Sequence, residues 1–81
     1  MVTVGEVLKN KREKLKISIE TVSLDTKIQK RFLKFIENNE FFPFESEVFL
    51  TGFIKIYAKY IKDRLKENIN FTYILNNFLY K

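Results

Sequence analysis

The chain has 81 residues, no cysteine, no histidine and a formal net charge of +5. This length fits a single domain. The missing cysteine excludes disulfides and thiolate zinc sites, and the missing histidine removes the commonest general base and metal ligand. No glycine-rich phosphate loop is present, so the sequence predicts a non-enzyme without metal or cofactor. We find no apolar signal-peptide region and no run near the roughly 18 apolar residues of a membrane span, which favours a cytoplasmic location.

The N-terminal half predicts three short helices. Thr3 and Glu6 form a capping box at the start of the first helix, and Ser18 is the candidate N-cap of the second. A tight turn at residues 25–27 then leads into the third helix, with Asp25 or Thr26 where a glycine is usual. Two short helices joined by such a turn are typical of a helix-turn-helix. We expect these three helices at residues 3–16, 19–25 and 29–38.

The C-terminal half predicts two further helices after an aromatic connector. Pro43 stops helix continuation, and the phenylalanines around it (Phe41, Phe42 and Phe44) are expected to cover one end of the core. Ser46 or Glu45 begins the long fourth helix. Its Gly52 predicts a close approach by another helix, because a mid-helix glycine costs about 1 kcal/mol against alanine. The last two helices are expected at residues 46–62 and 71–80, which makes residues 1–81 an all-α, five-helix, repressor-like helix-turn-helix bundle.

The fourth helix carries more apolar surface than a small core needs. Its apolar side chains cover roughly 160° of the circumference, whereas a core-facing stripe needs little more than about 100°. Helical periodicity divides this arc into two edges, but it does not say which of them faces the core. The first edge comprises Leu50, Ile54, Tyr57 and Ile61, and the second comprises Phe49, Phe53, Ile56 and Tyr60.

One hypothesis is a DNA-binding regulator. The second helix of the motif would read the major groove, where glutamine can pair with adenine and arginine with guanine. The basic first helix would add phosphate contacts. The glutamates that follow the reading helix argue against this, because they would be repelled by DNA phosphates. The candidate reading residues are Gln29, Lys30, Arg31 and Lys34, and the glutamates are Glu37, Glu40, Glu45 and Glu47.

The alternative comes from a resemblance to a known family. The segment GEVLKNKREKLKISIETVSLDTKI, residues 5–28, resembles the start of the cytoplasmic helix-turn-helix domain of the RodZ family of bacterial cell-shape proteins. The segment VFLTGFIKIYAKYI, residues 48–61, is similar to that family's continuation. A departure follows at residues 61–69, where the family usually has a glycine and a short acidic helix start.

The resemblance implies an adaptor that binds the actin-like filament protein MreB and links it to the membrane for rod-shape maintenance. It implies partner contacts at Phe49 and Phe53, with Lys55 and Tyr57 as neighbouring candidates. The first edge of the apolar arc, which begins with Leu50, thereby becomes the candidate core edge. We therefore expect the adaptor function, with weak or absent DNA binding. The family's membrane span is not within these residues. The chain is then either part of a longer protein that continues into a span or a soluble relative with another task.

Overall fold

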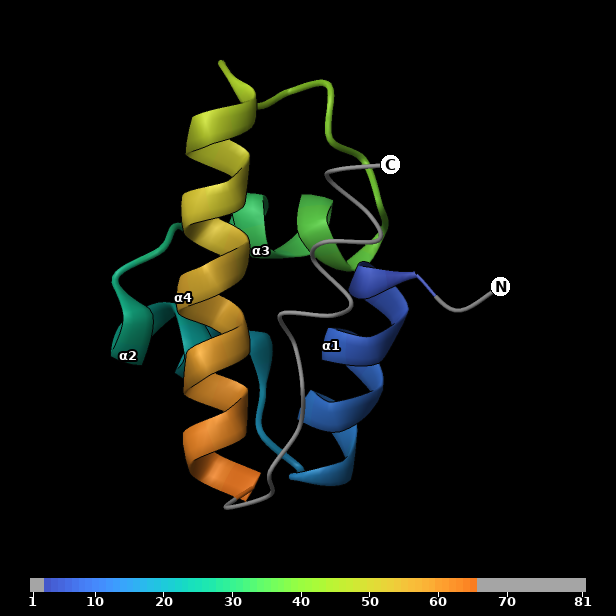
Figure 1. The fold of residues 1–81 in the computed structure, drawn as a ribbon. Coiled ribbons are helices and arrows are strands. Elements are labelled where there is room, and N and C mark those ends of the chain that lie inside the picture. Colours follow the sequence, from blue (N-terminus) through green and yellow to red (C-terminus); the bar gives the residue numbers. More distant parts are fainter. Residues whose placement is uncertain (1–2, 66–81) are drawn as a thin grey trace.

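The computed structural model describes residues 3–65, and within them it shows four helices and no strand (Figure 1). The all-α prediction is therefore confirmed for this part of the chain. The fifth helix, predicted at residues 71–80, lies outside the described residues. The fourth helix continues three residues beyond its predicted end. The helices are α1 (Val4–Lys14), α2 (Ile19–Thr26), α3 (Lys30–Glu37) and α4 (Glu47–Leu65).

Three helices begin at the hydroxyl side chains that the sequence indicates. The Thr3 Oγ1 accepts from the Glu6 N–H at 3.2 Å, and the Ser18 Oγ accepts from the Thr21 N–H at 3.1 Å. The Ser46 Oγ likewise accepts from the Phe49 N–H at 3.1 Å. Each bond satisfies a backbone donor that the first turn of a helix leaves without a partner. The predicted N-caps are thus confirmed.

Left-handed residues mark where the first three helices give way to turns. Lys16, Lys27 and Asn39 have φ values of 58°, 65° and 59°. Asn39 takes this conformation just past the end of α3, because asparagine tolerates the left-handed region. In the helix-turn-helix itself the left-handed residue is Lys27, whereas Asp25 and Thr26 complete the last turn of α2. The turn therefore comprises residues 27–29, two residues later than predicted.

α4 packs against α1 and α2, and α3 packs mainly against the same two helices. In Figure 1, α1 runs beside α4, while α2 and α3 lie behind it. The buried side chains of α4 are those of the predicted core edge of its apolar arc, together with Ala58. They meet the buried residues of α1, α2 and α3. The core comprises Val4, Leu8, Ile19, Val22, Ile28, Leu33, Ile36, Phe44, Leu50, Ile54, Tyr57, Ala58 and Ile61.

The close helix crossing lies at Gly5 and not at Gly52. A Cβ added at Gly52 meets no atom within 4 Å, so the expected neighbour is absent from the described part of the chain. A Cβ added at Gly5 would lie 2.7 Å from the Glu37 carbonyl oxygen and 2.7 Å from the Asn39 Oδ1. The Gly5 N–H also donates to that Oδ1 at 3.2 Å. The start of α1 therefore packs directly on the backbone at the end of α3.

Candidate functional site

Five phenylalanines form a cluster where α3, the connector at residues 38–46 and α4 meet. We call Phe32, Phe35, Phe44, Phe49 and Phe53 the aromatic cluster. The Phe32 ring centroid lies 5.3 Å from that of Phe44 and 5.4 Å from that of Phe53, and the Phe49 and Phe53 centroids are 5.1 Å apart. These spacings are typical of favourable aromatic pairs. The cluster therefore fixes the direction in which α4 leaves the connector.

The aromatic cluster runs from the core to the surface. Phe44 is buried, Phe53 is half-buried, and Phe49 is 49% exposed. Of the two predicted partner contacts, Phe49 therefore lies at the outer edge of the cluster. Phe53 packs against Phe32 and Phe44, so it supports the fold as well as the surface.

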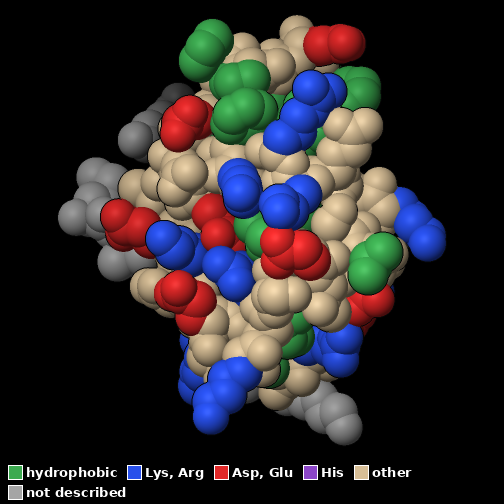
Figure 2. All heavy atoms as spheres, turned by 180° about the vertical axis from the view of Figure 1, so that it is seen from behind, with side chains coloured by type: hydrophobic (Ala, Val, Ile, Leu, Met, Phe, Trp, Pro, Cys, Tyr) green, Lys and Arg blue, Asp and Glu red, His purple; other side chains and the backbone are tan. Residues whose placement is uncertain are grey.

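Further apolar side chains extend this surface. Phe42 is 92% exposed, Val48 is 82% exposed and Ile56 is 46% exposed. Figure 2 shows hydrophobic side chains gathered at the end of the molecule where the connector leads into α4. The expectation that the connector phenylalanines cover the core is right for Phe44 and wrong for Phe42. We call Phe42, Val48, Phe49 and Ile56 the apolar face.

The sequence analysis missed Val48. At about 100° per residue it lies roughly 80° outside the Ile56 edge of the arc, so it was not placed within the arc. A signal was nevertheless present, because Val48 lies two turns before Ile56, and such residues share one side of a helix. Lys55, also predicted as a partner contact, is exposed near Ile56.

Tyr57 is not a surface residue, which corrects its prediction as a partner contact. Its side chain is fully buried, and its hydroxyl donates to the Glu37 Oε2. Burial, followed by the hydrogen bond to this carboxylate, raises the pKa of Tyr57 far above its usual range. The physical reason is its place on the core edge of the α4 arc. Tyr57 can therefore affect a partner only by holding α4 in position.

Glu37 is buried too, which corrects its prediction as one of four glutamates that would repel DNA phosphates. The Arg12 Nε donates to the Glu37 Oε2 at 2.7 Å, and the Arg12 Nη2 donates to the Oε1 at 3.1 Å. The Arg12 Nη1 donates to the Ile17 carbonyl oxygen at 2.9 Å. The hydrogen bond to Glu37 raises the pKa of Arg12. The acidic surface after α3 is thus reduced to Glu40, Glu45 and Glu47.

The four candidate DNA-reading residues are all exposed at α3. Two of them are engaged by neighbours. The Lys30 Nζ lies 2.8 Å from the Glu20 Oε2, and the guanidinium carbon of Arg31 lies 4.8 Å from the Phe32 ring centroid. In the view of Figure 2, basic and acidic side chains are interleaved over the middle of the molecule. The structure brings Gln29, Lys30, Arg31 and Lys34 together without making a uniformly basic surface.

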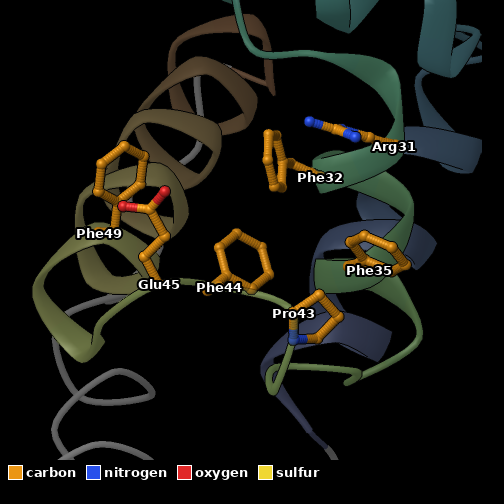
Figure 3. Close-up of a pocket in the computed structure, with 7 residues that line it drawn as sticks. All are labelled: Arg31, Phe32, Phe35, Pro43, Phe44, Glu45 and Phe49. Carbon is orange, nitrogen blue, oxygen red and sulfur yellow. The ribbon is translucent and has the colours of Figure 1, made fainter.

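A pocket of about 420 Å³ opens beside the aromatic cluster (Figure 3). Its walls are aromatic, but two charged side chains stand at its margins, Arg31 on the α3 side and Glu45 beside Phe49. Sequence reasoning did not place these two residues together, because they come from separate elements. The pocket is lined by Arg31, Phe32, Phe35, Pro43, Phe44, Glu45 and Phe49.

Residues 7–62 match the sequence family described as a helix-turn-helix domain, to which the N-terminal domain of RodZ also belongs. The chain belongs to this helix-turn-helix family. It is also 34% identical over 80 residues to an uncharacterized protein of Haemophilus influenzae. That match covers 95% of this chain and 26% of the relative, so the chain spans about a quarter of the relative's length. No solved structure gives a significant match.

A second polar network holds the helix-turn-helix against α4. The Tyr60 hydroxyl donates to the Asp25 Oδ2 at 2.6 Å, and the Arg64 Nη2 donates to the same oxygen at 2.9 Å. The bond from Tyr60 and then the bond from Arg64 lower the pKa of Asp25. The end of α2 is therefore tied to the last turns of α4.

Within residues 3–65 of the helix-turn-helix domain, no group of three or more acidic, cysteine or histidine side chains could hold a metal ion. No helix in the same range has the length and apolar character needed to cross a lipid bilayer.

Proposed function

We propose that this helix-turn-helix domain is a non-enzymatic adaptor that binds an actin-like filament protein of the MreB type through its apolar face. The proposal places the domain in the cytoplasm and links the filament to the membrane through a longer chain. It is supported by the family shared with the N-terminal domain of RodZ and by the exposed aromatic surface at the start of α4.

The observation that carries the proposal is the exposure of the apolar face. Phe42, Val48, Phe49 and Ile56 are each about half exposed or more. Burying apolar surface contributes roughly 25 cal/mol per Å². Aromatic side chains at the centre of such a surface are the usual anchors of protein interfaces. Phe49 has this position, because Phe53 supports it from behind and Val48 lies next to it along the helix.

Co-sedimentation with polymerised MreB-type protein tests the proposal. The variant Val48→Ser with Phe49→Ala removes exposed apolar surface without touching a buried core residue. We expect at least a tenfold loss of affinity, about 1.4 kcal/mol or more, with an unchanged helical circular dichroism spectrum. The matched control is Leu24→Ser, which removes an apolar side chain that is 73% exposed on α2. Equal pelleting of the variant and the control would overturn the assignment of the surface.

Sequence-specific DNA binding is the second candidate function. It is favoured by the exposure of Gln29, Arg31 and Lys34 on the second helix of the motif. Against it, Glu40, Glu45 and Glu47 are exposed directly after that helix and repel phosphates. We expect only weak binding to duplex DNA at physiological salt in a gel-shift assay. Tight, sequence-selective binding that is lost in Gln29→Ala and Lys34→Ala would reverse the order of the two functions.

A further inference from the structure

The pocket in Figure 3 combines aromatic walls with charged margins, whereas the apolar face has no charged member. Phe32 and Phe44 lie in its middle, and Phe49 closes it on the α4 side. Its volume of about 420 Å³ lies within the ~300–1,000 Å³ usual for binding pockets. Aromatic walls favour a bulky apolar group, because each ring offers a large surface to bury.

Two opposite charges frame the pocket. Arg31 extends from α3, and Glu45 lies on the other side, beside Phe49 (Figure 3). Both side chains are exposed, and neither forms an ion pair with another residue between 3 and 65. The Arg31 guanidinium lies over the Phe32 ring, which limits its freedom and keeps it at the margin of the pocket.

We propose that the pocket receives one bulky apolar side chain of a partner protein, carried between an acidic residue that pairs with Arg31 and a basic residue that pairs with Glu45. The inference rests on the proposed adaptor function and specifies the chemistry of the bound segment. Because the two charges lie on opposite sides, they also determine the direction in which that segment crosses the domain.

The same two charges disfavour simpler occupants. An anion such as a phosphate would gain a pairing with Arg31 but would be repelled by Glu45. A small cation would face the reverse problem. A purely apolar segment would cover the aromatic walls but would leave Arg31 and Glu45 unpaired at the margins of the pocket. Only a segment that carries an acidic and a basic residue beside its apolar side chain can pair with both Arg31 and Glu45.

Synthetic helical peptides test this arrangement. The first peptide has a central phenylalanine with glutamate one turn before it and lysine one turn after it. The second has glutamate on both sides. In an NMR titration of the ¹⁵N-labelled domain, we expect the first peptide to shift the resonances of Phe44, Phe49 and their neighbours saturably. The second should bind roughly fivefold more weakly, about 1 kcal/mol.

A charge exchange supplies the decisive comparison. In the Glu45→Lys variant the preference should reverse, so that the peptide with two glutamates binds more tightly. In Arg31→Glu, a third peptide with lysine on both sides should become the preferred one. Both substitutions are at exposed positions, which leaves the core intact. Absence of pocket shifts with the first peptide, or unchanged preferences in both variants, would overturn the inference.

The peptide titrations separate this inference from the proposed function. If the charge exchange works but MreB-type filaments do not pellet the domain, the pocket assignment stands and the named filament partner is wrong. If the filaments bind through Val48 and Phe49 while no peptide prefers its matching variant, the adaptor function stands and the pocket assignment is wrong.

Discussion

The hydroxyl of Tyr57 donates to the carboxylate of Glu37, and both side chains are buried. This bond joins α4 to α3, and Arg12 brings α1 to the same carboxylate. A single buried acid is therefore shared by three of the four described helices. Because an unpaired buried carboxylate is costly, each of its partners should contribute measurably to stability.

The first prediction concerns the Tyr57 hydroxyl. Tyr57→Phe keeps the ring in the core and removes one donor from a buried charge, which should lower the free energy of unfolding by about 1.5–3 kcal/mol. Urea denaturation followed by circular dichroism measures the loss. The matched control is Tyr60→Phe, which removes exposed bonds to Asp25 and Arg64 and should therefore cost clearly less. Equal losses of unfolding free energy in the two variants would show that the buried bond to Glu37 contributes no more than an exposed one.

The second prediction concerns Arg12. Arg12→Met leaves the Glu37 carboxylate without its cation, and breaking such a pair costs about 3–5 kcal/mol. The double variant Arg12→Met with Glu37→Gln no longer buries an uncompensated charge. It should therefore be more stable than Arg12→Met alone. Thermal melts of the two variants and of Glu37→Gln provide the measurement, and a double variant less stable than Arg12→Met would contradict the charge argument.

The third prediction is a pH dependence from Asp25. Its pKa in the folded domain is lower than its ordinary value of 3.8, first because of Tyr60 and then because of Arg64. The ionised form therefore stabilises the fold above this ordinary value, and the stabilisation is lost as the pH falls through the lower, folded pKa. Unfolding midpoints measured from neutral pH into strong acid should fall less steeply at the acidic end in Asp25→Asn than in the wild type. Superimposable profiles would argue against the Asp25 network.

The fourth prediction compares the two glycines. In Gly5→Ala the new methyl group would collide with backbone oxygen of α3, which cannot rotate away, and we expect a loss of about 1–3 kcal/mol. In Gly52→Ala the methyl group meets open space, and the better helix propensity of alanine should add about 1 kcal/mol. Denaturant midpoints of the two variants should therefore move in opposite directions.

Local chemistry was enough to predict much of this fold. Thr3, Ser18 and Ser46 cap helices because the preference depends only on a hydroxyl near the first free backbone donors. Helical periodicity divided the apolar arc of α4 into two edges, but the choice of the core edge came from the family resemblance, and the structure confirms that choice. The exposure of Phe49 agrees with its predicted place at the surface, whereas its partner stays a prediction.

Features that depend on distant pairs could not be predicted in the same way. Glu37 looks like one of several acidic surface residues until Arg12, 25 positions earlier, is known to lie beside it. The close approach was predicted at Gly52, whereas the crossing of α1 with α3, which the sequence does not show, places it at Gly5. The pocket between Arg31 and Glu45 depends likewise on how the connector places α4 against α3.

The open position at Gly52 has a consequence for anything that approaches α4 from outside. Val48 and Ile56 lie one turn on either side of it, so this row of side chains is interrupted at a position where a Cβ would meet no atom of the described residues within 4 Å. A neighbouring helix that crosses at the interruption can come nearer to the α4 axis than at either flanking residue. A methyl group there would stabilise the isolated domain and, at the same time, hold any such neighbour farther away.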